Sequence, residues 1–139
     1  MSTHLRTFIV EDSAVIRENL VAALEEMLPL KVVGTAEDEA SAVQWLNDPG
    51  HGCELGIIDI FLKRGTGLGV LKAIRGSNRG IKLVVLSNFA TPDMRRACIE
   101  LGADKVFDKS NEIDSLLLYC GRLAAGESGD SGAAALDAL

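Results

Sequence analysis

Residues 55–62 of the chain, Leu55-Gly56-Ile57-Ile58-Asp59-Ile60-Phe61-Leu62, form an apolar run that is interrupted by a single carboxylate. Continuous apolar runs are typical of strands that are buried on both faces of a parallel sheet. An unpaired charge inside such a strand is costly, so Asp59 indicates a functional position rather than a structural one. The run therefore predicts a buried strand, Leu55–Ile60, that ends beside a candidate site.

Four more apolar runs lie on either side of this one, and each of the five is followed by an amphipathic segment. Strict alternation of strands and helices predicts a parallel sheet with helices on both faces. We therefore expect an α/β, doubly wound domain with a five-stranded parallel sheet. The predicted strands are Leu5–Val10, Lys31–Thr35, Leu55–Ile60, Ile81–Leu86 and Lys105–Phe107. The predicted helices are Ser13–Leu28, Glu39–Leu46, Leu68–Arg75, Pro92–Leu101 and Glu112–Leu123.

The first predicted helix has an apolar face at helical spacing, which we expect to pack on the sheet. Its members are Ile16, Leu20, Ala23, Leu24 and Met27. Pro29 ends this helix, because proline cannot continue it. Before the fourth helix, Thr91 is a favourable N-cap and Pro92 occupies the first helical position.

The chain has 139 residues, a length that corresponds to one domain. Its hydrophobic fraction of 47% and charged fraction of 24% are those of an ordinary globular domain, which argues against disorder. The net charge of −6 argues against direct binding to nucleic acid or to an anionic membrane surface. Residues 126–139 are rich in Gly, Ser and Ala and predict a flexible tail behind a domain of residues 1–125.

The three cysteines, Cys53, Cys98 and Cys120, form no C-x-x-C pattern, so a zinc or thioredoxin-like site has no support. Residues 1–6 lack the apolar core of a secretory signal. The longest apolar runs are also too short to span a membrane. Together these features predict a cytoplasmic protein with reduced thiols.

Polar and charged side chains follow four of the predicted strands. Glu11 and Asp12 follow the first strand, Asp59 lies at the end of the third, Ser87 follows the fourth and Lys109 follows the fifth. Ligands of open α/β sheets bind beyond the carboxyl ends of the strands, so these side chains should converge. Each one has an ordinary alternative, such as an acidic helix cap, a serine cap or a surface lysine, and their convergence is what favours a site.

Three neighbouring carboxylates repel one another, and a divalent cation relieves that repulsion. Magnesium prefers such hard oxygen ligands, together with water and phosphate oxygens. Asp59 could act as a carboxylate nucleophile that forms an aspartyl phosphate. Lys109, Ser87 and the ion would then stabilise the charge on the transferring phosphoryl group. The set of residues therefore predicts phosphoryl transfer to Asp59.

Over residues 6–125 the sequence resembles the receiver domain of two-component response regulators, in particular the single-domain chemotaxis regulators. The resemblance rests on Glu11-Asp12-Ser13, Asp59 after an apolar strand, Gly67, Ser87 after Leu83–Leu86, Leu101-Gly102-Ala103-Asp104 and Lys109. It implies a flavodoxin-like sheet with strand order 2-1-3-4-5. It also implies an output face made by the helix at 92–101, the strand at 105–107 and the helix at 112–123.

The resemblance implies a role for each site residue. Asp59 would be the phosphoacceptor. Asp12 would ligate Mg²⁺ directly, Glu11 would act mainly through water, and the backbone carbonyl of Phe61 would complete the protein ligands. Ser87 would bind a phosphoryl oxygen and move inward on activation, and Lys109 would pair with the phosphate.

Three positions depart from the family pattern. Lys63 stands where many relatives carry proline, so we expect a more basic and more flexible loop. Ser110 follows Lys109 in place of the common proline, which predicts a trans peptide bond. Val106 occupies the place of the usual switch aromatic, with Phe107 beside it. A ring rotation of the family type is therefore in question.

Phe61 and Phe89 each lie two residues beyond a site residue, where we expect apolar bulk at the rim that slows water attack on the phosphoaspartate. Among other aromatic and imidazole residues, we expect His4 and His51 to be exposed bystanders and Trp45 to be partly packed. Tyr119 is a candidate for contact with a partner.

The resulting hypothesis is a phosphorylation-operated switch that takes its phosphoryl group from a histidine kinase or a histidine phosphotransfer protein. Such a receiver catalyses only its own phosphorylation and slow dephosphorylation. It would change its binding of a downstream protein or form a homodimer. The alternatives are a receiver-like interaction module that is never phosphorylated and a receiver fragment of a longer transcriptional regulator. Enzyme classes have less support, since Phe61 stands where a haloacid-dehalogenase-type phosphatase needs a second aspartate.

Overall fold

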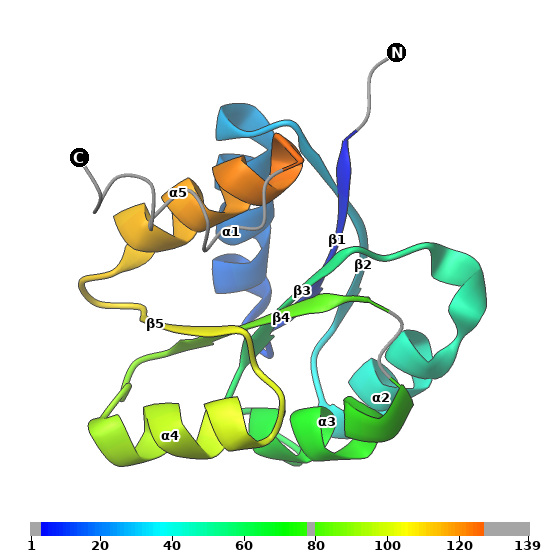
Figure 1. Cartoon of the computed structure of the whole chain (residues 1–139), viewed down its shortest axis with the longest axis vertical. Coiled ribbons are helices and arrows are strands. Elements are labelled where there is room, and N and C mark those ends of the chain that lie inside the picture. The colour runs from blue at the N-terminus through cyan, green and yellow to red at the C-terminus, as the bar shows by residue number, and fades with distance from the viewer. Residues whose placement is uncertain (1–3, 78–79, 127–139) are drawn as a thin grey trace.

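The computed structural model describes residues 4–77 and 80–126 and contains the predicted parallel sheet (Figure 1). The strand order is β2-β1-β3-β4-β5, and all neighbouring strands are parallel, which confirms the predicted fold class and order. The strands are β1 Leu5–Val10, β2 Leu30–Ala36, β3 Leu55–Asp59, β4 Lys82–Ser87 and β5 Lys105–Asp108. The predicted tail lies outside the described residues apart from Gly126.

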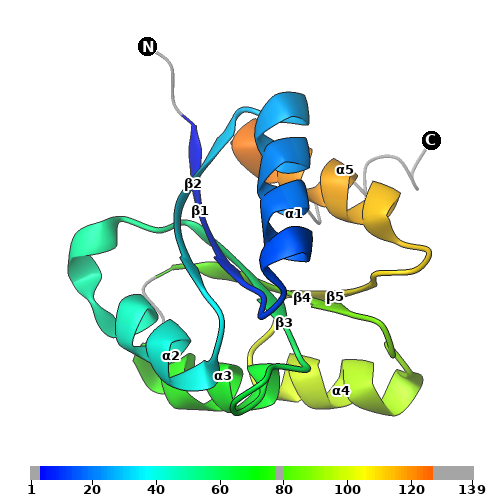
Figure 2. The same ribbon diagram turned by 180° about the vertical axis from the view of Figure 1, so that it is seen from behind.

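Helices cover both faces of the sheet, with α1 and α5 on one side and α2, α3 and α4 on the other (Figure 2). The α-helices are α1 Ala14–Met27, α2 Glu39–Asn47, α3 Gly67–Ile74, α4 Pro92–Glu100 and α5 Ile113–Ala124. Two short 3-10 turns, η1 Pro49–His51 and η2 Arg75–Ser77, follow α2 and α3. Predicted boundaries differ from these by at most one residue, within the usual uncertainty at fraying element ends.

Two apolar layers hold the sheet between the helices. All five residues of β3 are buried, as expected for a central strand. Ile58 and Val85 belong to the layer under α2, α3 and α4, whereas Ile57 and Val84 belong to the layer under α1 and α5. Successive side chains of a strand point to opposite faces, so each apolar run supplies both layers.

The caps predicted for α1 and α4 are present. The Ser13 hydroxyl accepts a hydrogen bond from the Ile16 N–H, and the Thr91 hydroxyl accepts one from the Met94 N–H. Leu28 is the C-cap of α1, directly before the proline that was expected to end it. These local signals explain where the connections after β1 and β4 turn into helices.

The predicted inward face of α1 is partly wrong. Ile16 and Met27 are 46% and 63% exposed, and Ala23 is exposed as well. Leu20 and Leu24 contact the core as predicted, and Val21 and Leu28 contact it in addition. The side of α1 that meets the sheet carries Leu20, Val21, Leu24 and Leu28, and the predicted face is offset from it.

No helix within residues 4–77 and 80–126 has the length and apolar character needed to cross a membrane.

Candidate functional site

The three predicted carboxylates meet at the carboxyl end of the sheet. Glu11 follows β1 directly, and Asp59 is the last residue of the neighbouring strand β3. Each of Glu11, Asp12 and Asp59 offers a carboxylate oxygen, and these oxygens lie within 4.8 Å of one another. Glu11 and Asp59 are buried, and Asp12 is half-buried. The strand ends therefore place three acidic groups in one small volume, as the sequence predicts.

Lys109 reaches this cluster from the turn after β5. Its Nζ donates hydrogen bonds to Glu11 Oε1 at 2.7 Å and to Asp59 Oδ2 at 2.8 Å. The lysine side chain is only 13% exposed. When all three carboxylates are ionised, they carry three negative charges, and Lys109 offsets one of them. The four side chains together then carry a net charge of −2.

Burial and pairing act against each other on the ionisation of these groups. Burial raises the pKa of Asp59, and the hydrogen bond from Lys109 only partly opposes this effect. Burial also favours the neutral form of Glu11, but the bonds from Lys109 and from the Ser13 N–H outweigh it and lower the pKa of Glu11. The bonds to both carboxylates likewise outweigh burial and raise the pKa of Lys109. The ammonium form of Lys109 is therefore favoured, and of the two carboxylates that it contacts, Asp59 is the one whose ionised form is less favoured.

This donor set fits a magnesium ion. Carboxylate oxygens are the hard ligands that Mg²⁺ prefers, and a divalent charge equals the two uncompensated negative charges. The Phe61 backbone lies two residues beyond Asp59, and its N–H donates to Asp59 Oδ1 at 3.3 Å. Glu11, Asp12 and Asp59 are thus grouped around one position, and the backbone N–H of Phe61 adjoins it.

Ser87 is placed at the same edge and is fully buried as the last residue of β4. Its carbonyl accepts the Lys109 N–H at 2.8 Å, which ties the turn that carries Lys109 to β4. Its hydroxyl accepts the Phe89 N–H at 3.2 Å. The serine therefore links the strand end to the loop that leads into α4.

Arg17 is a contributor that the sequence did not reveal. Its guanidinium donates to the backbone carbonyl of Glu11 at 2.7 Å and so holds the turn after β1. Nothing in the sequence distinguishes it from an exposed arginine on a helix, apart from its position one turn after the Ser13 cap.

Two phenylalanine rings stand at the rim, as expected. Phe61 and Phe89 are 50% and 67% exposed. Their ring centroids are 5.9 Å apart with an interplanar angle of 87°, a favourable edge-to-face pair. The pair joins the loops that follow β3 and β4.

Val106 and Phe107 point to opposite faces of the sheet. Val106 packs in the layer under α2, α3 and α4, and Phe107 packs in the layer under α1 and α5. The Phe107 ring lies 6.0 Å from the ring of Tyr119, which is itself only 4% exposed. Phe107 is therefore not placed to act as an aromatic switch on the α4 side, and the expectation that Tyr119 contacts a partner is wrong. The Lys109–Ser110 peptide bond is trans, as predicted.

His51 is another correction, because it is half-buried rather than an exposed bystander. Its ring stacks on Trp45 at 3.8 Å, and Trp45 stacks on Phe8 at 4.0 Å on its other side. Trp45 is partly packed, as expected. His4 is exposed.

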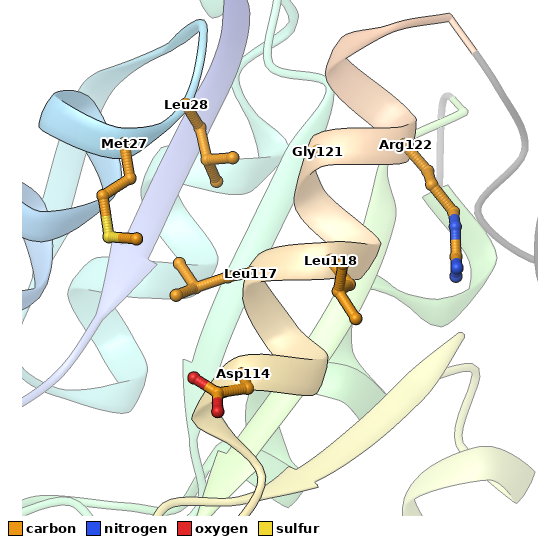
Figure 3. Close-up of a pocket in the computed structure, with 7 residues that line it drawn as sticks. All are labelled: Met27, Leu28, Asp114, Leu117, Leu118, Gly121 and Arg122. Atoms are coloured by element: carbon orange, nitrogen blue, oxygen red, sulfur yellow. The ribbon is translucent and has the colours of Figure 1, made fainter.

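A groove of about 570 Å³ lies away from the carboxylates, between the C-terminal end of α1 and the side of α5 (Figure 3). Met27 and Leu28 face Leu117 across it. Residues of the acidic cluster do not line this groove. The groove is thus separate from the carboxyl edge of the sheet.

The sequence of residues 7–120 matches the family model of the response regulator receiver domain. The chain belongs to this receiver family. Receivers of this family act in two-component signalling, and they generally bind Mg²⁺ at an acidic pocket such as the Glu11, Asp12 and Asp59 cluster.

A probable transcriptional regulatory protein of Picosynechococcus sp. is similar to this receiver, with 31% identity over 125 residues. The match covers 86% of this chain and 49% of the relative, so the chain spans about half the length of that protein.

Solved structures show the same fold. The response regulator domain of Thermotoga maritima CheB has a TM-score of 0.76 and 22% identity, covering 88% of this chain and 96% of that one. A LuxR-family response regulator from Aurantimonas sp. has a TM-score of 0.79 and 19% identity, and the match covers 90% of this chain and 88% of that chain. The isolated receiver of Salmonella enterica RcsB, solved with a phosphomimetic beryllium fluoride, has a TM-score of 0.76 and 21% identity, covering 90% and 91%.

Proposed function

We propose that this receiver accepts a phosphoryl group on Asp59 and that Glu11, Asp12, Asp59 and the Phe61 carbonyl hold Mg²⁺ beside it. The observation that carries the proposal is the Lys109 ammonium shared between Asp59 and Glu11 in a buried acidic cluster. A buried carboxylate with a cation beside it and two uncompensated charges is arranged for a reaction that brings in phosphate and metal together.

In the proposed step an Asp59 carboxylate oxygen bonds to the phosphorus of a phosphohistidine on the donor protein. The phosphorus–nitrogen bond breaks, and the donor imidazole keeps its electron pair. Lys109 moves from Asp59 to a phosphoryl oxygen, and the Ser87 hydroxyl donates to another. Mg²⁺ held by Glu11, Asp12, Asp59 and the Phe61 carbonyl would supply positive charge that offsets the negative charge of the phosphoryl group.

Dephosphorylation reverses the modification without a partner. A water oxygen bonds to phosphorus, and the bond to the Asp59 oxygen breaks and leaves Asp59 as a carboxylate. Inorganic phosphate carries away the water oxygen and one of its protons, and the other proton passes to solvent. Phe61 and Phe89 narrow the approach of that water, so hydrolysis is slow. The only chemistry of the chain is then its own phosphorylation and dephosphorylation.

A histidine kinase or a histidine phosphotransfer protein is the proposed donor, and the cytoplasm is the proposed location of the receiver. The proposed output is a change in protein binding, or homodimer formation, at the face made by α4, β5 and α5. The relation to a transcriptional regulator twice as long supports a second candidate, in which this receiver controls a further domain of a longer protein.

Intact-mass spectrometry after incubation with acetyl phosphate, with and without Mg²⁺, tests the assignment. We expect the wild type to gain one phosphoryl group only with Mg²⁺, and Asp59→Asn to gain none. Asp93→Asn is the matched control, because Asp93 is an exposed aspartate in the first turn of α4. If neither acetyl phosphate nor a phosphorylated histidine protein modifies the folded wild type, the chain is a constitutive interaction module.

A further inference from the structure

The loop that joins β3 to α3, residues 60–66, follows the phosphoacceptor directly and contains Phe61. The loop contains no proline, so no proline ring restricts its backbone. Hydrogen bonds and packing contacts must hold its conformation. The Gly67 N–H donates to the Ile60 carbonyl at 2.8 Å, and Phe61 and Thr66 form an antiparallel bridge. The conformation of Phe61 therefore depends on where Thr66 is held.

Glu39, the first residue of α2, contacts this loop twice. Its backbone N–H donates to the Arg64 carbonyl at 3.0 Å, and its Oε1 accepts the Thr66 N–H at 2.9 Å. Arg64 lies at the tip of the loop and Thr66 is its last residue. Glu39 therefore holds the loop at two places. Because α2 and α3 lie side by side, the start of α2 is a rigid support for this contact (Figure 2).

Two glycines make room for the Glu39 carboxylate. A Cβ atom built at Gly65 or at Gly69 would overlap with the Glu39 side chain. Gly65 also has a φ of +82°, a conformation that disfavours any other residue. The carboxylate lies over the first turn of α3, where the helix dipole favours a negative charge. The side chain of Glu39 thus occupies a place that is shaped for it on the loop.

We propose that Glu39 is a positioning residue for the metal site. Glu39 fixes the backbone of Thr66, and Thr66 forms a β-bridge with Phe61. Through these contacts Glu39 would hold the Phe61 carbonyl in place as a ligand for Mg²⁺. This inference rests on the proposed Mg²⁺ site. Groups that orient metal ligands without touching the metal commonly change its affinity by one to two powers of ten on removal.

Magnesium titration by isothermal calorimetry, without a phosphodonor, tests this role. We expect Glu39→Ala to bind Mg²⁺ about tenfold more weakly than the wild type. Glu39→Gln keeps an acceptor for the Thr66 N–H and should stay within about twofold of the wild type. Glu37→Ala removes an exposed glutamate two residues earlier and should leave the affinity unchanged.

Gly69→Ala gives an independent test. Gly69 lies in α3, and alanine is the better helix former, so the intrinsic helix propensity of α3 rises in this variant. Its methyl group displaces the Glu39 carboxylate without deleting it, so the Mg²⁺ affinity should fall as in Glu39→Ala. Amide hydrogen exchange without Mg²⁺ should also quicken in residues 60–66 of both variants.

The outcomes separate the two proposals. If the wild type itself does not bind Mg²⁺, the proposed metal site fails. If the wild type binds Mg²⁺ and both Glu39→Ala and Gly69→Ala bind it equally well, the metal site stands and the positioning role of Glu39 is wrong. An equal loss in Glu39→Gln and Glu39→Ala would also contradict it, because the amide keeps the acceptor.

Discussion

At the scale of single residues, Lys109 balances the charge of the site. One ammonium contacts two buried carboxylates, and an oxygen of the third carboxylate lies within 4.8 Å of an oxygen of each. Buried charges are tolerated when they are paired, and removal of one partner leaves the others uncompensated. The same lysine therefore stabilises the buried carboxylates and, in the proposed reaction, would pair with the phosphoryl group.

Replacement of Lys109 should expose this dual role. We expect Lys109→Met, which keeps the apolar stem, to lower the free energy of unfolding by about 3 kcal/mol at neutral pH. Mg²⁺ should stabilise the variant more than the wild type, because the ion replaces the missing positive charge. Urea unfolding with and without Mg²⁺ measures both effects. Equal stability of the variant and the wild type would show that Lys109 does not offset a destabilising repulsion between the carboxylates.

The ring of Phe89 should set how long the phosphate persists. Phe89→Ser opens the rim to water, so we expect the phosphorylated lifetime to shorten by roughly threefold. Decay of the phosphorylated mass over time measures it. Leu118→Ser, on the exposed side of α5, is the control and should leave the lifetime unchanged. An unaltered lifetime in Phe89→Ser would show that the ring pair does not shield Asp59.

At the scale of elements, α2 is seated on the sheet by a stack of rings. Trp45 lies between Phe8 of β1 and His51 of η1, with interplanar angles of 7° and 4°. Gly34 of β2 lies under the indole, and a Cβ atom there would stand 2.6 Å from the ring. Glycine at this point of β2 is thus a requirement of packing rather than of backbone conformation.

A methyl group at this position should disturb the stack. We expect Gly34→Ala to destabilise the protein by roughly 1–3 kcal/mol, the usual cost of overpacking. Gly76→Ala is the control, since a Cβ atom there meets no atom within 4 Å. Denaturant unfolding compares the two. A Gly34→Ala protein as stable as Gly76→Ala would mean that the indole moves aside freely.

Strands and site residues could be predicted from the sequence, whereas the contacts that support them could not. Asp59 and Lys109 are found by their position after apolar runs, because the carboxyl ends of parallel strands meet at one edge. The bond from the Thr66 N–H to Glu39 spans 27 residues, and Arg17 reaches a backbone carbonyl. Such contacts depend on loop conformations and on long side chains, neither of which leaves a periodic pattern.

At the scale of the whole molecule, Arg95 joins the parts of the proposed output face. From α4 its guanidinium donates to the carbonyl of Ala90, to the carbonyl of Val106 in β5 and to the Glu112 carboxylate at the start of α5. Glu112 also accepts the Asp108 N–H at 2.8 Å. The loop that follows Ser87 is therefore connected with α5 through one side chain.

This connection should appear in the pH dependence of stability. The hydrogen bond from Arg95, with that from the Asp108 N–H, lowers the pKa of Glu112 below its ordinary value of 4.5. A carboxyl whose pKa is lower in the folded protein than in the unfolded chain stabilises the fold at pH values above its unfolded pKa. This stabilisation is lost as the pH falls through its pKa in the folded protein. The free energy of unfolding of the wild type should therefore exceed that of Glu112→Gln by up to about 1 kcal/mol at pH 7.

The difference should shrink as the pH falls below 4.5, which urea unfolding at a series of pH values measures. Glu100→Gln, an exposed glutamate at the end of α4, is the control. A constant difference down to the acid limit would mean that Glu112 acts through packing and not through its charge.

The central claim is that Asp59 carries the phosphoryl group, and peptide mapping after borohydride reduction tests it most directly. Borohydride converts an acyl phosphate to an alcohol, so phosphorylated Asp59 would become homoserine. We predict homoserine at position 59 alone, and only after phosphorylation in the presence of Mg²⁺. Homoserine at position 12, or a phosphorylated protein whose residue 59 remains aspartate, would contradict the account.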